Sequence, residues 1–336
     1  MKAFGYKTCL PVSDPGFLIK LELAVPEVGP KDLLVEVRAI SVNPVDAKVR
    51  SRAEPENGQA KILGWDSAGV VKAVGSDVSM FKVGDEVWYA GSIARQGSNA
   101  EYQFVDERIV SLKPESLSFA EAAAMPLTSI TAWEILFDRL QVDSKTCGEI
   151  LIIGAAGGVG SILIQLAKKL TDLKIIATAS RPSSKDWVKQ LGADIVIDHS
   201  KNLQEQLVAE GIKDVKFVAS LTHTGDHFEQ ISEVIAPQGK LCLIDDPVEP
   251  LNLALVKWKS VSVHWEFMFT RSLYETDDIL KQHELLKQVA SMIDSGELRS
   301  TANKSLGGIN LENLKEAHRL IESGRSIGKI VLEGFE

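Results

Sequence analysis

The chain has few of the residues that define several large classes of protein. Its 336 residues include three cysteines, Cys9, Cys147 and Cys242, which are odd in number and far apart. This pattern argues against a disulfide framework and predicts reduced thiols in the cytoplasm. No apolar run is long enough to span a membrane, and the first residues lack a basic stretch followed by an apolar one. We therefore expect a cytoplasmic protein with no membrane partner.

Positive charge is also in short supply. Lys and Arg number 37 against 46 Asp and Glu, which gives a net charge of -9. An acidic chain without a basic stripe is not expected to bind nucleic acid. Histidine is scarce as well, and the 6 histidines are scattered without the spacing of metal ligands. The length and the hydrophobic fraction of 45% are typical of a globular protein with room for two domains.

What the sequence does contain is one informative glycine-rich turn. The run Ile150–Ile153 is short, apolar and rich in β-branched residues, as in a strand buried on both faces. Small residues follow it, and helical apolar spacing then covers residues 161–170. Because small residues allow a tight turn whose N–H groups reach a pyrophosphate, this context predicts a dinucleotide site. The contacting residues are expected to be Ala155, Ala156, Gly157, Gly158, Val159 and Gly160.

The order of strand and helix patterns predicts an α/β fold. From residue 150 onward, strands over 150–153, 174–178, 195–197, 215–219 and 240–244 alternate with helices over 161–170, 185–191, 203–210 and 228–235. This alternation predicts a doubly wound parallel sheet. The first third is rich in β-strand patterns, at 32–40, 67–74 and 85–89, and Ser118 and Glu121 have the spacing of a helix capping box. Helices over 279–293 and 311–322 and a strand over 330–332 close the chain.

The residues after the second predicted strand of this sheet favour NADPH over NADH. An NAD enzyme usually places a carboxylate there, which accepts hydrogen bonds from the ribose hydroxyl groups. This chain has Ser180 and Arg181, with Lys185 shortly beyond and no carboxylate before Asp186. A hydroxyl, a guanidinium and an ammonium together suit a 2′-phosphate. The alternative is that Arg181 and Lys185 are solvated charges at a helix start.

Five motifs in this order resemble the medium-chain dehydrogenase/reductase superfamily, in its zinc-free quinone oxidoreductase-like branch. The subgroup is often labelled zinc-type alcohol dehydrogenase-like protein. The motifs lie at 43–46 (NPVD), 64–69 (GWDSAG), 83–87 (VGDEV), 155–160 (AAGGVG) and 328–331 (GKIV). The resemblance implies a GroES-like, β-rich catalytic domain over 1–126 and 268–336, split by a Rossmann domain over 127–267. It also implies a homodimer joined through the edges of the Rossmann sheets.

The same resemblance shows which residues stand at the zinc-ligand positions of zinc-dependent relatives. Zinc-dependent relatives have a Cys ligand where this chain has Asn43, a His ligand where it has Trp65, and a further Cys near Leu127. Only Asp66, in the place of the family's Glu, could bind a metal. We therefore expect no metal, and a substrate that accepts hydride without a Lewis acid, such as a quinone or an enone.

Further site residues follow from the resemblance. Asn43 is implied as the catalytic donor to the substrate oxygen, although a turn residue before Pro44 is an equal alternative. The other implied cofactor contacts are Thr131 at the nicotinamide, Gly328 and Lys329 near the diphosphate, Leu243, Ile244 and Asp245 at the carboxamide, and His199 at the adenosine phosphate. His199 stands where the family has a Tyr, and a solvated loop residue is its alternative.

The substrate pocket is the least constrained prediction. The segment 263–274 combines aromatic residues with Met, so Phe267 and Met268 are pocket candidates together with Trp65 and Tyr89. Packing at an interface is the alternative for most of them. Two other functions remain open: a zinc-dependent alcohol dehydrogenase with unusual ligands, and a non-catalytic sensor that binds NADPH.

Overall fold

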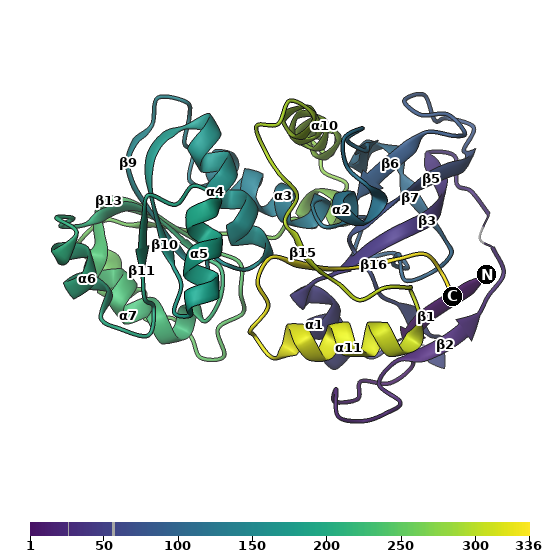
Figure 1. Ribbon diagram of the computed structural model, residues 1–336, viewed down its shortest axis with the longest axis horizontal. Helices are drawn as coiled ribbons and strands as arrows, with labels where there is room; N and C mark the ends of the chain where they lie inside the picture. Colours follow the sequence, from purple (N-terminus) through teal and green to yellow (C-terminus); the bar gives the residue numbers. More distant parts are fainter. Residues whose placement is uncertain (26, 56–57) are drawn as a thin grey trace. The chain divides into compact units, whose positions relative to one another are not determined.

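A computed structural model describes residues 1–25, 27–55 and 58–336. The chain divides into two compact units (Figure 1). Unit 1 comprises Met1–Ile130 and Phe269–Glu336, and unit 2 comprises Thr131–Met268. The domain boundaries predicted from the sequence are 126/127 and 267/268. Within the described ranges, no helix is both long and apolar enough to cross a membrane.

Unit 2 is built on a parallel sheet, and all of its residues are described. The six strands follow the order β11-β10-β9-β12-β13-β14, and every neighbouring pair is parallel. The strands are β9 (Cys147–Ile153), β10 (Asp172–Thr178), β11 (Ile195–Ile197), β12 (Val215–Ser220), β13 (Ile235–Leu243) and β14 (Ser262–Trp265). From β9 the chain adds β10 and β11 on one side, and then returns to add β12, β13 and β14 on the other side of β9. This strand order confirms the prediction of a doubly wound α/β fold.

Helices cover both faces of this sheet. They are α4 (Gly158–Leu170), α5 (Pro182–Gln190), α6 (Leu203–Ala209), α7 (Thr224–Val234) and the short α8 (Ala254–Lys257). In Figure 1, α4 and α5 lie on one side of the sheet, and α6 and α7 lie on the other. Strands enclosed in this way lose their contact with water on both faces, which is why Leu151, Ile153, Val218 and Leu241 are fully buried in one cluster.

The sixth strand, β14, corrects the sequence analysis, which predicted five strands here. Its residues belong to the segment 263–274, whose composition suggested a substrate pocket or an interface. Only four residues pair, from Ser262 to Trp265, and their burial does not alternate, because the two end residues are exposed and the two middle ones are partly buried. A short edge strand of this kind lacks the continuous apolar run that identifies a central parallel strand.

Unit 1 is mainly antiparallel β-structure. Within its described residues, a seven-stranded sheet contains β15 (Ala302–Ser305), β16 (Lys329–Glu333), β3 (Asp32–Val42), β5 (Ser67–Val74), β6 (Glu86–Tyr89), β8 (Val110–Leu112) and β7 (Tyr102–Asp106), which pairs with β3. A smaller sheet contains β2 (Ile19–Glu22), β1 (Lys2–Tyr6) and β4 (Lys61–Ile62). This architecture agrees with the predicted GroES-like, β-rich domain.

The helices of unit 1 surround these sheets. They are α1 (Pro44–Arg52), α2 (Phe119–Ala123), α9 (Thr270–Tyr274), α10 (Lys281–Asp294) and α11 (Leu311–Glu322), with the 3-10 turn η2 (Glu107–Ile109). The predicted capping box is present at α2, because Ser118 Oγ accepts the Glu121 N–H and the Glu121 carboxylate accepts the Ser118 N–H. Helix α3 (Pro126–Trp133) continues into the π-helical segment η3 (Glu134–Arg139).

Candidate functional site

The predicted dinucleotide turn lies between β9 and α4 in unit 2. Gly157 is the N-cap of α4, and no side chain caps the helix there. The first N–H groups of this helix are therefore available to an anion, which is the arrangement that binds a pyrophosphate. Gly154 has a φ of +76° at the end of the strand, and its N–H donates to the Thr178 hydroxyl at 3.1 Å. That bond ties the turn to the end of β10.

Gly160 explains how close the helix comes to the strand. A Cβ atom on Gly160 would lie 2.4 Å from the main-chain oxygen of Ala155, so only glycine fits without a shift of backbone. Ala155 is itself fully buried, whereas residues 156–159 are partly exposed. The turn is thus rigid at its two ends and accessible between them.

Residues at the end of β10 face a mixed electrostatic environment. Ser180, Arg181 and Lys185 are all partly exposed, and Arg181 is the N-cap of α5. The Lys185 ammonium lies 3.8 Å from a carboxylate oxygen of Asp198. Sequence reasoning missed Asp198, which follows β11 and becomes a neighbour because β10 and β11 are paired. This acid offsets part of the positive charge predicted for a 2′-phosphate.

Histidines gather beside the same strand ends. The His199 and His227 rings meet edge to face, with centroids 6.0 Å apart, and His223 Nδ1 is 2.7 Å from the Thr222 hydroxyl. Burial lowers the pKa of both His199 and His227, each of which also lies within the field of His223. His199 is therefore half-buried in a histidine group rather than solvated. Sequence reasoning did not find His223 and His227.

The remaining predicted residues of unit 2 are in varied environments. Leu243 ends β13 and is buried, while Ile244 and Asp245 are partly exposed at the carboxyl end of the sheet. The Asp245 carboxylate accepts the Thr224 N–H at 2.8 Å and so holds the start of α7. Thr131 and Met268 are buried, whereas Phe267 is 45% exposed.

In unit 1, a network of buried polar groups surrounds Asn43. Asp66 Oδ2 accepts a hydrogen bond from Asn43 Nδ2 at 3.0 Å and forms an ion pair with Lys329 Nζ at 2.8 Å. The Lys329 ammonium also donates to Asn43 Oδ1. Asn43 and Asp66 are at most 1% exposed, and Lys329 is 3% exposed. The structure therefore brings together the predicted residues Asn43 and Lys329, and adds Asp66.

Backbone N–H groups fix the acids of this network. Asp46 accepts hydrogen bonds from the N–H groups of Asn43 at 2.8 Å and Gly64 at 2.9 Å. Asp66 Oδ1 accepts the Leu127 N–H, in the first turn of α3, at 2.9 Å. A carboxylate at that position is stabilised by the positive end of the helix. The second N–H of the Asn43 amide points to the Ser41 carbonyl at 3.3 Å.

Burial dominates the titration of the two acids. It raises the pKa of Asp46 to about 7, although the backbone N–H of Asn43 and the Lys329 ammonium act in the opposite direction. Burial likewise raises the pKa of Asp66, opposed first by Lys329 and then by the Leu127 N–H. A desolvated carboxylate beside one ammonium is the least costly arrangement for charge in this environment.

Two of the predicted pocket residues are part of the interior of unit 1. Trp65 is fully buried, its indole N–H donates to the Ser92 carbonyl at 3.1 Å, and its ring meets Phe269 edge to face. Tyr89 is 1% exposed and packs in the core with Val71 and Val87. Burial raises the pKa of the Tyr89 phenol, which makes its proton hard to remove.

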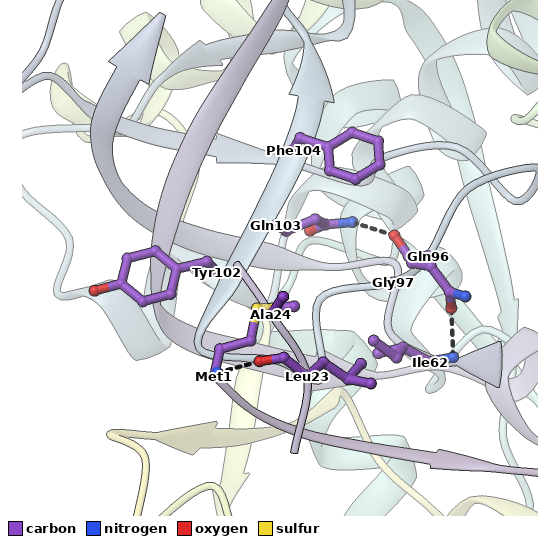
Figure 2. A pocket seen from close by; sticks show the side chains of 9 residues that line it. All are labelled: Met1, Leu23, Ala24, Ile62, Gln96, Gly97, Tyr102, Gln103 and Phe104. Carbon is purple, nitrogen blue, oxygen red and sulfur yellow. Dashed lines mark hydrogen bonds between the residues drawn. The ribbon is translucent and has the colours of Figure 1, made fainter. Parts of the chain in front are cut away.

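A separate pocket lies elsewhere in unit 1. Figure 2 shows Gln96 between the Ile62 N–H, which donates to its side-chain oxygen at 2.6 Å, and the Gln103 amide, which donates to its carbonyl at 3.0 Å. The lining residues are Met1, Leu23, Ala24, Ile62, Gln96, Gly97, Tyr102, Gln103 and Phe104. None of the predicted site residues lines this pocket.

Comparison with known proteins defines the class of the molecule. Residues 29–126 match the alcohol dehydrogenase GroES-like domain, and residues 191–332 match the zinc-binding dehydrogenase family. A zinc-type alcohol dehydrogenase-like protein of Staphylococcus epidermidis is 38% identical over 99% of both chains. The NADPH-dependent alkenal/one oxidoreductase of Arabidopsis thaliana chloroplasts is 31% identical, over 99% of this chain and 79% of that protein.

Solved structures that are similar to this chain belong to the same class of oxidoreductase. A Rhizobium etli CFN 42 protein provisionally described as a zinc-dependent alcohol dehydrogenase has a TM-score of 0.97 and 53% identity, over 100% of this chain and 98% of that one. The Escherichia coli quinone oxidoreductase complexed with NADPH has a TM-score of 0.85 and 25% identity, over 99% and 100% of the chains. The fold and its turn thus define an NAD(P)-dependent oxidoreductase. The chain belongs to the medium-chain dehydrogenase/reductase superfamily, as its motifs predicted.

The matched family name implies zinc, and the residues of unit 1 can be compared with what zinc requires. Zinc needs several lone-pair donors directed at one point. Here Asn43 Oδ1 and Asp66 Oδ2 already accept hydrogen bonds from the Lys329 ammonium. The other oxygen of Asp66, Oδ1, accepts a hydrogen bond from the Leu127 N–H. Across the described ranges, no group of three or more His, Cys, Asp or Glu residues could hold a metal ion. These residues do not fit a zinc ion.

Substituting Gly160 tests the geometry of the turn. We expect Gly160→Ala to lower the free energy of unfolding by about 1–3 kcal/mol, because the added Cβ overlaps the Ala155 main chain. Gly225→Ala, in the first turn of α7, is the matched control, since its Cβ would meet only Pro247 Cβ at 3.8 Å. Urea denaturation measures both. Equal, small changes in the two variants would contradict the close approach of α4 to β9.

The titration of Asp46 predicts a pH-dependent contribution to stability. Its folded-state pKa, about 7, exceeds the unfolded value near 3.9. The protonated acid therefore stabilises the fold below about pH 4, and this contribution is lost as the pH rises to 7. We expect the stability advantage of the wild type over Asp46→Asn to shrink by roughly 1–3 kcal/mol between pH 5 and pH 8.

Urea midpoints at several pH values measure this difference. Asp172→Asn, at an exposed position, serves as the control and is expected to follow the wild type at each pH. Parallel profiles for the wild type and Asp46→Asn would show that Asp46 stays ionised throughout this range.

Proposed function

We propose that this protein is an NADPH-dependent reductase of quinones, enones or similar activated alkenes, and that it works without a metal. The observation that carries this proposal is the buried Asn43–Asp66–Lys329 network, in which an ammonium satisfies the oxygens that a metal would need. One relative named as an NADPH-dependent alkenal/one oxidoreductase and a similar structure named as a quinone oxidoreductase support the substrate class.

The nucleotide is proposed to bind unit 2. The uncapped start of α4 suits the pyrophosphate. Ser180, Arg181 and Lys185 suit a 2′-phosphate, with His199 beside them, and Leu243, Ile244 and Asp245 lie at the strand end where ligands of such sheets bind. Thr131 is proposed at the nicotinamide. When bound, NADPH supplies a hydride for an electrophilic carbon of the acceptor.

In unit 1, Asn43 is proposed to stabilise the negative charge that develops on the acceptor oxygen. Its N–H toward the Ser41 carbonyl is the more weakly held of the two, at 3.3 Å, and is the one proposed to donate to the acceptor. The Lys329 ammonium faces Asp66 and Asn43. For the diphosphate we therefore propose the main chain of Gly328. Phe267, Met268, Trp65 and Tyr89 remain proposed pocket residues, of which Trp65 and Tyr89 are buried within unit 1.

A homodimer in the cytoplasm is also proposed. Strand β14 is the edge of the unit 2 sheet, and Trp265 at its end is 56% exposed. An edge strand with an exposed aromatic residue suits pairing with a second copy. The three cysteines are unpaired, which suits a reducing compartment.

Turnover assays test the proposed activity. We expect the purified protein to oxidise NADPH in the presence of 3-buten-2-one or 1,4-benzoquinone, and the chelator 1,10-phenanthroline to leave the rate unchanged. Metal analysis of the same protein should find well below one zinc ion per chain. The physical reason is that delocalised negative charge on these acceptors can be stabilised by hydrogen bonds alone.

Two results would favour other functions. Stoichiometric zinc together with chelator-sensitive oxidation of alcohols would identify a zinc-dependent alcohol dehydrogenase, which is the provisional description of the similar Rhizobium etli structure. Tight binding of NADPH with no turnover of any acceptor would instead favour a non-catalytic sensor.

Arg181 provides a test of cofactor choice. We expect Arg181→Glu to raise the Kd for NADPH about tenfold or more, which corresponds to ~1.4 kcal/mol, because a carboxylate repels the 2′-phosphate. The Kd for NADH should change much less. Lys189→Glu, in the last turn of the same helix, is the charge-matched control. Fluorescence titration measures each Kd, and an unchanged NADPH affinity in Arg181→Glu would remove Arg181 from the site.

A further inference from the structure

Lys329 is one of the most deeply buried charged groups of the chain. It begins β16, and its side chain is 4% exposed. Lysine is almost never buried to this degree unless it is paired. Here two oxygens from separate elements converge on one ammonium: Asn43 Oδ1, from the start of α1, and Asp66 Oδ2, from the segment before β5.

The surrounding groups complete a cage for a positive charge. Asp66 Oδ1 is held by the Leu127 N–H, and the Asn43 amide is oriented by donation to Asp66 Oδ2 and the Ser41 carbonyl. These bonds fix which Asn43 atom faces the ammonium, since its nitrogen must face acceptors. The carboxyl group of Asp46 accepts hydrogen bonds from two backbone N–H groups, one of which is that of Asn43.

We propose that this cluster is a built cation site and that the Lys329 ammonium is its resident cation. The tethered charge holds Asp66 and the Asn43 amide in place and closes the site to external divalent ions. A second cation would bring like charge within a few ångströms of the first in a desolvated environment, which is strongly unfavourable.

The proposal predicts a specific consequence of removing the tether. Lys329→Ala deletes the group from Cγ to Nζ, which has the size and charge of n-propylammonium. The vacated site should then bind that ion from solution. We expect Lys329→Ala to lower Tm by roughly 10 °C, because one buried charge loses its partner. Tens of millimolar n-propylammonium chloride should recover several degrees of this loss.

Matched comparisons isolate the charge and the place. The neutral analogue 1-propanol should not recover the Tm of Lys329→Ala, and n-propylammonium should not raise the wild-type Tm. Lys315→Ala removes another largely buried lysine of unit 1, which pairs only weakly with Glu312 at 3.8 Å, and its Tm should not respond to the amine. The double variant Asp66→Asn/Lys329→Ala should also be unresponsive, and should be more stable than Lys329→Ala alone.

Three outcomes would overturn the proposal: a Tm for Lys329→Ala within a degree of the wild type, equal responses to the amine and the alcohol, or an amine response that persists without the Asp66 carboxylate. If Lys329→Ala does not fold alone, refolding with and without the amine replaces the melting curves. Failure of the amine to restore folding, together with an unstable double variant, would then refute it.

The proposed function relies on the same network, but these measurements need neither cofactor nor acceptor, so their outcome is distinguishable from that of the turnover assays. Amine-specific recovery without any enone turnover would keep the cation site and remove the proposed activity. Turnover without amine-specific recovery would do the reverse.

Discussion

The ion pair between Lys329 and Asp66 is the interaction on which unit 1 depends. Each group alone would cost several kcal/mol to bury, and the pair offsets that cost only because additional hydrogen bonds satisfy the remaining donors and acceptors. Those bonds come from α1, from the segment before β5 and from the first turn of α3. One strand near the end of the chain therefore holds together elements that are up to 286 residues apart in sequence.

The regular elements of the fold were the most predictable. β5, β11 and α11 have the bounds expected from their apolar patterns, because strand alternation and helical spacing are local properties of the sequence. The glycine-rich turn was equally readable, since a tight approach of helix to strand demands small residues at fixed spacing. The spacing of Ser118 and Glu121 likewise predicts the hydrogen bonds of the capping box that they form.

What the sequence could not provide was the identity of long-range partners. Lys329 reads as a basic residue after a glycine, which suits a phosphate as well as a buried acid, and only the fold decides that it meets Asp66. The residues that follow β10 in sequence do not indicate Asp198, yet the pairing of β10 with β11 places it beside Lys185. β14 was missed for a related reason, because an edge strand that is half exposed leaves no apolar run to detect.

The Asp66 carboxylate also holds the start of helix α3. Asp66 accepts the N–H of Leu127, and Thr131 follows four residues later in the same helix, so both lie along one face, a single turn apart. A helical turn is too stiff to absorb a shift at its first residue. The hydrogen bond from Leu127 to Asp66 therefore restrains the first turn of the helix that carries Thr131.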